Sequence, residues 1–180
     1  MNIFKTINTQ FWRTLAKFVS RPAVRDWLIL RAKRTPYNHI LSPDGTEAYM
    51  LRYWLFNPYP ASGEAKRFGM GWMPSVRIHH ILIKDQDRHH HDHPWNARTI
   101  VLQGGYSEDR SGTHFARVPG NTATLRFEEY HRITYVTTGG VYTMFITWKQ
   151  RGEWGFNVDG KKVLWREYLA NEKNNGLSKP

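Results

Sequence analysis

The sequence predicts a mainly β domain, a sandwich or barrel, that follows a pair of amphipathic helices. From residue 48 onward, short stretches rich in β-branched and aromatic residues are separated by turn signals such as Gly104-Gly105. Strands this short and this regularly spaced are typical of a sandwich or barrel and not of alternating β and α units. Before them, over residues 1–40, apolar residues recur at spacings of three and four, which is the period of a helix.

Two helices are expected before the β domain. An apolar stripe spans residues 3–19, with Arg13 and Lys17 off it, as in an amphipathic helix. Pro22 marks the start of a second helix, which ends before Pro36 because the residue preceding a proline avoids the helical conformation. We expect these helices to pack against the β domain, with a position on a membrane surface as the alternative.

The later elements follow from turn signals and periodicity. Asp159-Gly160 suits the positive φ angles of a type I′ turn and predicts a tight hairpin, and residues 165–175 predict a short helix. Segment 59–74 is expected to be a loop at the lip of a pocket. Strands are expected over residues 48–56, 76–83, 98–103, 113–118, 123–127, 131–136 and 141–148. The predicted organisation is a helical extension over residues 1–40, a barrel over 45–170 and a tail over 171–180.

Length and composition bound the class of protein. With 180 residues, of which 40% are hydrophobic and 14% aromatic, the chain can bury one proper core despite a net charge of +11. The charge is concentrated in residues 1–40, which carry a net +7. The absence of cysteine excludes a disulfide framework and a thiolate metal site, and it fits a cytoplasmic protein. No apolar run approaches the roughly 18 residues needed to cross a bilayer, so we expect no transmembrane segment.

A cluster of histidines over residues 89–93 is the strongest sign of a functional site. In an extended segment, residues i and i+2 share a face, so His91 and His93 can hold one ion together while His90 and Asp92 point the other way. A third protein ligand must then come from elsewhere in the fold. The nearest downstream histidines are His114 and His131.

The spacing of these residues resembles the two sequence motifs of the cupin superfamily. The first motif has His-x-His and a later glycine, which match His91, His93 and Gly105, whereas Arg98 occupies the place of the motif's glutamate. The second motif has a glycine and a histidine at the separation found between Gly120 and His131. The stretch "HDHPW" is also similar to cupin-like proteins of bacteria and phages. The resemblance implies a double-stranded β-helix, or jelly-roll barrel, behind the N-terminal helices.

The resemblance also implies a function. His91, His93 and His131 would hold one divalent transition metal, because neutral imidazoles suit Fe, Zn, Ni or Cu. Among these ions Fe(II) is favoured, since the implied enzyme uses oxygen. The implied protein is a metal-dependent cupin enzyme, a non-haem iron dioxygenase or hydroxylase that acts on a small polar or anionic substrate. We expect Arg98 and Tyr106 to contact the substrate. Cupins often pair as dimers, so a homodimer is expected by analogy.

Two alternatives remain open at the level of sequence. His90 and Asp92 with His131 would form the two-histidine, one-carboxylate triad of Fe(II)/2-oxoglutarate oxygenases. The chain could instead be a non-catalytic binding module whose basic N-terminus contacts nucleic acid. Whether Glu129 adds a carboxylate ligand, or Asp92 orients one of the histidines, is also open.

Overall fold

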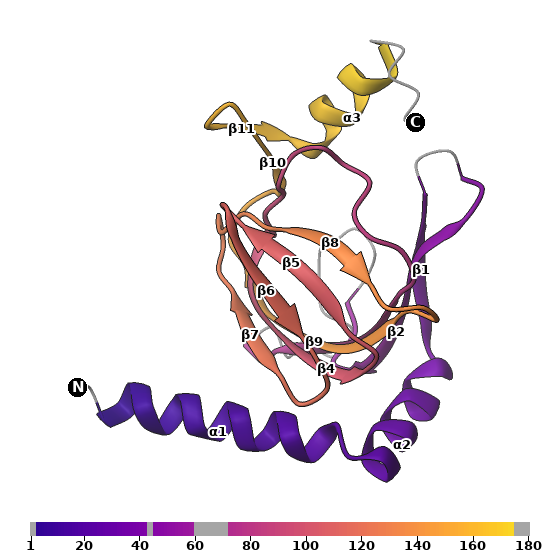
Figure 1. The fold of residues 1–180 in the computed structure, drawn as a ribbon, viewed down its shortest axis with the longest axis vertical. Helices are drawn as coiled ribbons and strands as arrows, with labels where there is room; N and C mark the ends of the chain where they lie inside the picture. Colours follow the sequence, from indigo (N-terminus) through magenta and orange to yellow (C-terminus); the bar gives the residue numbers. More distant parts are fainter. Residues whose placement is uncertain (1–2, 43–44, 60–71, 175–180) are drawn as a thin grey trace.

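The computed structural model describes residues 3–42, 45–59 and 72–174, which form a β-barrel with helices at both ends (Figure 1). The helices are α1 (Ile3–Val19), α2 (Pro22–Lys33) and α3 (Trp165–Asn174). The strands are β1 (Pro36–Leu41), β2 (Ala48–Phe56), β3 (Ser75–Ile81), β4 (Trp95–Gln103), β5 (Tyr106–Arg110), β6 (Thr113–Arg117), β7 (Thr122–Leu125), β8 (Arg132–Val136), β9 (Val141–Gln150), β10 (Gly155–Val158) and β11 (Lys161–Leu164). The expectation of a mainly β domain behind two helices is confirmed.

Two antiparallel sheets face each other to make the barrel. One has six strands in the order β1-β2-β3-β9-β4-β7, and the other has three in the order β6-β5-β8. Apolar residues from both sheets meet between them. The larger sheet contributes Ile81, Val101 and Val141, and the smaller one contributes Tyr106 and Ile133. The space between the two sheets is therefore a packed apolar core around these residues.

The outer face of the six-stranded sheet is also buried, because α1 and α2 pack on it. Ala16 of α1 and Ile29 of α2 join one apolar cluster with Ile78 of β3, Ile100 of β4 and Ile146 of β9. β3, β4 and β9 are thus covered on both faces, by helices outside and by the opposite sheet inside. This explains why β4 and β9 carry apolar residues at consecutive positions instead of only at every second one.

Most predicted elements are present, and two strands were not predicted. All seven predicted strands and the C-terminal helix are confirmed. The hairpin between β10 and β11 turns at Asp159 and Gly160, whose φ angles of 50° and 80° match the predicted type I′ turn. β1 and β5 were missed because their polar and charged residues weaken the apolar pattern. The predicted loop over 59–74 lies largely outside the described residues.

Candidate metal site

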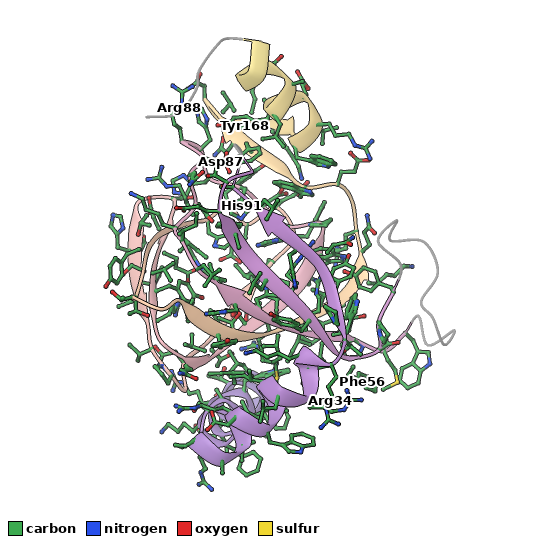
Figure 2. All side chains as sticks on the ribbon, turned by 90° about the vertical axis from the view of Figure 1, so that its right-hand side faces the viewer. Arg34, Phe56, Asp87, Arg88, His91 and Tyr168 are labelled. Carbon is green, nitrogen blue, oxygen red and sulfur yellow. The ribbon has the colours of Figure 1, made fainter. Side chains whose placement is uncertain are left out.

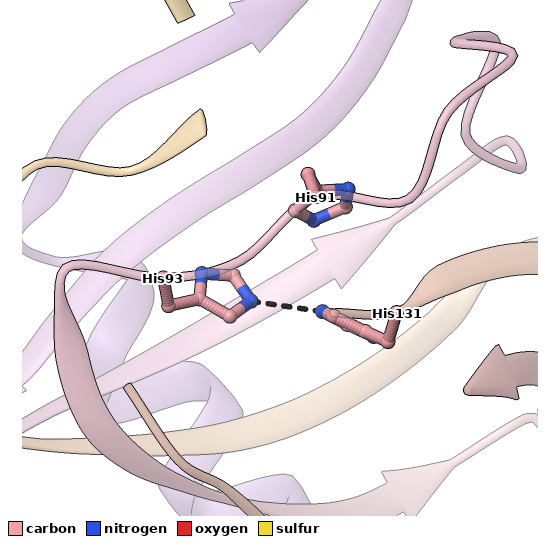
Figure 3. A group of neighbouring side chains, drawn as sticks. All are labelled: His91, His93 and His131. Atoms are coloured by element: carbon pink, nitrogen blue, oxygen red, sulfur yellow. Dashed lines mark hydrogen bonds between the residues drawn. The ribbon is translucent and has the colours of Figure 1, made fainter. Parts of the chain in front are cut away.

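Three histidines come together in the barrel (Figure 3), and His91 among them lies near the end that carries α3 (Figure 2). His91 and His93 lie on the segment between β3 and β4, and His131 immediately precedes β8. The backbones of His91 and His131 hold each other in place, because the N–H of each donates to the carbonyl of the other at 2.9 Å. One metal-ligating atom from each of the three side chains lies within 4.8 Å of the others. The three histidines that the spacing predicts are therefore brought together.

The protonation of these side chains suits a metal site. Nε2 of His93 and Nε2 of His131 are 2.9 Å apart, a separation that two nitrogen ligands of one ion also adopt (Figure 3). Burial lowers the pKa of His91, and burial together with the neighbouring imidazoles lowers the pKa of His93 well below its ordinary value. Neutral imidazole is the form that binds metals, so the environment favours the ligating state of both residues.

Two buried carboxylates lie behind the histidines. Asp85 Oδ2 is 3.6 Å from His91 Nδ1, and Glu108 Oε2 is 3.3 Å from His131 Nδ1. A carboxylate at Nδ1 favours the tautomer that carries its proton there, which leaves the Nε2 lone pair for an ion. Asp85 is itself fixed, because it accepts hydrogen bonds from the Ile133 N–H at 2.7 Å and from the Tyr49 hydroxyl.

Glu108 is the more deeply embedded of the two carboxylates, with 1% of its surface exposed. Arg117 Nε donates to it at 2.7 Å, and Arg110 Nη2 lies 3.1 Å from its Oε1. Burial alone would raise the pKa of Glu108, but the contact with His131 and the two guanidinium groups lower it to about 2. Glu108 is thus an ionised carboxylate that faces His131. The sequence reasoning missed it, and the only signal was an acidic residue two positions after Tyr106.

The prediction that Arg98 contacts the substrate is wrong, because the Arg98 side chain lies outside the barrel. It stacks over the Trp12 ring of α1 at 4.5 Å and donates to the hydroxyls of Thr122 and Thr124. Side chains alternate along β4, so the inward positions beside it belong to Ala97 and Thr99. The motif position that normally carries glutamate is used here to attach a helix.

Two aromatic residues near the site, the predicted Tyr106 and also Trp95, are packed against other rings or apolar side chains. The Tyr106 side chain is buried in the apolar cluster between the sheets, and burial raises its pKa. Its contact with a substrate stays a prediction. Trp95 packs beside the site, since its ring stacks on that of His93 with a centroid distance of 6.3 Å and an interplanar angle of 20°.

The alternative triad of His90, Asp92 and His131 is wrong, because two of its members face away from the third. His90 Nε2 lies 2.9 Å from the carboxylate of Asp109. Asp92, fully buried, accepts hydrogen bonds from the Gly155 N–H and from the Lys162 ammonium group, so it fastens the C-terminal hairpin and orients none of the ligands.

Glu129 does not complete the site either. Its carboxylate lies 2.8 Å from Arg110 Nη1 and accepts a hydrogen bond from the Arg126 N–H. In the described residues, Asp85 and Glu108 stand behind the histidines instead.

A buried arginine lies next to the histidines. Arg77 of β3 is 2% exposed, and its guanidinium carbon lies 5.1 Å from the ring centroid of Trp95 and 5.5 Å from that of Phe145. Both rings also contact His93, so one aromatic layer separates Arg77 from the candidate metal site. The sequence signal was a polar residue at every second position of β3, since Ser75, Arg77 and His79 share its inner face.

The positive charge of Arg77 has no carboxylate partner among the described residues. Its Nε and Nη2 atoms are buried without a hydrogen bond in this part of the chain, and they lie on the same edge of the planar group. Burial lowers the pKa of Arg77, while the nearby phenols of Tyr59 and Tyr37 oppose that change. Neutral rings and phenols stabilise a cation only in part, so the free edge is suited to a carboxylate or phosphate.

Known structures share this fold. No protein-family model and no curated protein matches the sequence. A chain from the crystal structures of the DMSP lyases RdDddP and RnDddQII has a TM-score of 0.52 and 15% identity, and the match covers 71% of this chain and 64% of that one. Fe(II) HppE has a TM-score of 0.45 and 14% identity, with 62% and 55% covered. KdgF from Halomonas sp. has a TM-score of 0.40 and 11% identity, with 58% and 85% covered. Together with the two facing antiparallel sheets, the first of these likenesses shows that the chain has a cupin-like β-barrel fold, in which three histidines could form a metal site.

Proposed function

We propose that this chain is a metal-dependent cupin enzyme, a non-haem iron dioxygenase or hydroxylase that acts on a small anionic substrate. The observation that carries the proposal is the convergence of His91, His93 and His131, with ligating atoms within 4.8 Å of one another. Three neutral nitrogen donors suit iron, zinc, nickel or copper better than magnesium or calcium. Fe(II) held there would activate O₂ for reaction with the substrate, which itself supplies the electrons that dioxygenation requires; amino-acid side chains alone do not activate O₂ in this way.

The chain's own residues prepare the site in two ways. Asp85 and Glu108 lie beside Nδ1 of His91 and His131, at 3.6 and 3.3 Å, and so favour the tautomers that leave the Nε2 atoms available as ligands. The rings of Trp95 and Phe145 pack beside His93, and apolar surroundings of this kind strengthen electrostatic interactions.

Arg77 replaces Arg98 as the residue that binds the substrate's anionic group. Its Nε and Nη2 form one edge that can donate two parallel hydrogen bonds to a carboxylate or phosphate. An anion bound there would lie on the other side of the Trp95 ring from His93, so the remainder of the substrate would have to pass beside this ring to reach the histidines. The substrate class supported by this arrangement is a small molecule with one carboxylate or phosphate group.

Elemental analysis tests the metal. Protein purified without a tag under anaerobic conditions should contain about one iron per chain. His91→Ala and His131→Ala should lose it, whereas His114→Ala, at an exposed position on β6, should keep it. Absence of metal after incubation of the parent protein with Fe(II) would overturn the proposal. Zinc in place of iron would exclude the oxygen chemistry and indicate Lewis-acid chemistry at the same site.

Anion binding tests the substrate class separately. Malonate and inorganic phosphate should raise the melting temperature of the parent protein more than glycerol does, and the effect should disappear in Arg77→Gln. Arg98→Gln is the matched control and should respond as the parent does. Iron content should stay unchanged in Arg77→Gln, because the residue holds no metal. An equal response to malonate and phosphate in parent and Arg77→Gln would refute the role of Arg77 while leaving the metal site in place.

A further inference from the structure

The two N-terminal helices expose large apolar side chains to solvent. On α1 these are Ile7, Phe11 and Phe18, and on α2 they are Trp27 and Leu30, with relative exposures between 49 and 64%. Single exposed apolar residues are common, but five on two adjacent helices form a surface that usually has a partner. The helices lie at the end of the molecule opposite α3, and α1 extends past the barrel (Figure 1).

These side chains do not belong to the faces that hold the helices on the barrel. On α1 the buried positions are Ala16 and Val19, whereas Ile7, Phe11 and Phe18 are spaced by four and seven residues and so form a separate stripe. α2 repeats the arrangement, because Leu28, Ile29 and Ala32 are buried while Trp27 and Leu30 are exposed. The apolar stripe is therefore left over after the helices have packed.

Positive charge surrounds this surface. Residues 1–40 carry a net charge of +7, with Asp26 as the only acidic residue. Arg13 and Lys17 on α1 and Arg31 and Lys33 on α2 are exposed. Asp26 pairs with Arg25 at 3.0 Å. Apolar side chains flanked by exposed cations are the features of a helix that lies in the interface of an anionic membrane.

The charge also distinguishes between occupants of the surface. A second copy of the chain would place one cluster of cations against another, which like-charge repulsion opposes. Single-stranded nucleic acid would use the cations and stack on aromatic rings, but it would leave Ile7 and Leu30 without a function. An anionic phospholipid surface uses both the cations and the aliphatic side chains.

We infer that α1 and α2 form a docking surface for anionic phospholipid membranes, with Ile7, Phe11 and Phe18 inserted among the lipid chains and the arginines and lysines at the headgroups. No described helix is long and apolar enough to span a bilayer, so the helices would lie along the surface. The barrel would then stand on the membrane with its histidine end on the far side, because α3 and the helices lie at opposite ends (Figure 1).

Vesicle sedimentation tests the inference on the full chain. The protein should sediment with vesicles of equal parts phosphatidylglycerol and phosphatidylcholine, and far less with phosphatidylcholine alone. Replacement of both rings, Phe11→Ser with Phe18→Ser, should weaken binding about tenfold or more, since each ring buries a large apolar area. Phe115→Ser on β6 is the control, because it removes an exposed ring away from the helices. Arg13→Gln with Lys17→Gln should weaken binding to anionic vesicles and reduce its dependence on salt.

Several outcomes would overturn the inference. Both double variants alter exposed positions, so their melting temperatures should equal that of the parent protein. Equal binding to both vesicle types, or no binding to either, would refute an anionic membrane as the partner. A dimer in solution that Phe11→Ser with Phe18→Ser dissolves would assign the surface to self-association. Binding of oligouridylate that depends on Arg13 and Lys17 but not on the two rings would assign it to nucleic acid.

Discussion

Replacing Glu108 by glutamine should destabilise the metal-free protein by an amount that follows from its environment. The pKa of Glu108 is about 2 in the folded chain, against an ordinary value of 4.5. A difference of this size corresponds to about 3 kcal/mol of folding stability. Because the pKa is lowered by folding, the contribution is complete at pH values above the ordinary pKa and disappears as the pH falls from 4.5 toward 2. At pH 7 the variant Glu108→Gln should therefore be less stable than the parent protein by this full contribution of about 3 kcal/mol.

Urea unfolding in the presence of a chelator, repeated between pH 7 and pH 2, measures this effect. The difference in the free energy of unfolding between the parent and Glu108→Gln should be about 3 kcal/mol at pH 7. It should disappear near pH 2, where the parent carboxyl is protonated and, like an amide, uncharged. Glu129→Gln is the control, because Glu129 also pairs with Arg110 but its side chain is 35% exposed. An exposed ion pair is worth about 1 kcal/mol or less. A gap that stays constant down to pH 2, or one no larger than that of Glu129→Gln, would refute the reasoning.

Three further predictions concern the rest of the fold. Asp92→Asn should cost about 3 kcal/mol, because it breaks a buried pair with Lys162, and amide hydrogen exchange should accelerate first in the β10–β11 hairpin. Gly139→Ala should cost about 1 to 2 kcal/mol from its positive φ angle. Gly140→Ala should cost more in the same urea titration, because its new methyl group would also lie 2.7 Å from a backbone carbonyl oxygen. Leu102→Ala, at a fully buried position under the helices, should lower the free energy of unfolding by about 2 to 5 kcal/mol.

The histidines could be predicted because their geometry is local. Side chains two positions apart in an extended segment share a face, so His91 and His93 follow from spacing alone. His131 required a family motif, because nothing in the intervening residues indicates that the two segments pair. The structure supplies the reason for their proximity, since the backbones of His91 and His131 exchange two hydrogen bonds.

The charged residues around the site could not be predicted, because their positions depend on which face of a sheet is covered. In β3, polar Ser75, Arg77 and His79 alternate with apolar Val76 and Ile78, and such a pattern normally places the polar residues in solvent. Here α1 and α2 cover the outer face, so the polar side chains turn into the barrel. The sequence of β3 alone does not indicate that α1 and α2 cover its outer face.

Glu108 was missed for a related reason. It lies in β5 between Ser107 and Asp109, in a stretch that resembles an exposed strand. Its burial is tolerated only because Arg110 and Arg117 approach it from the same small sheet. Arg98 was assigned to the site because the family motif has a ligand there, but an inward arginine at that position would have left the Trp12 ring of α1 uncovered.

The backbone pairing of the site also decides when it can form. His91 pairs with His131 and with Phe156 of β10. These two partners are distant in sequence from His91 and from each other. Contacts between distant segments form late in folding, because the intervening chain must first be ordered. The histidines therefore meet only where the segment before β4 pairs with the residue before β8, a contact that requires the barrel to be closed there. If these histidines hold a metal, a chelator should empty the site without unfolding the chain, because the backbone pairing that positions them does not depend on the ion.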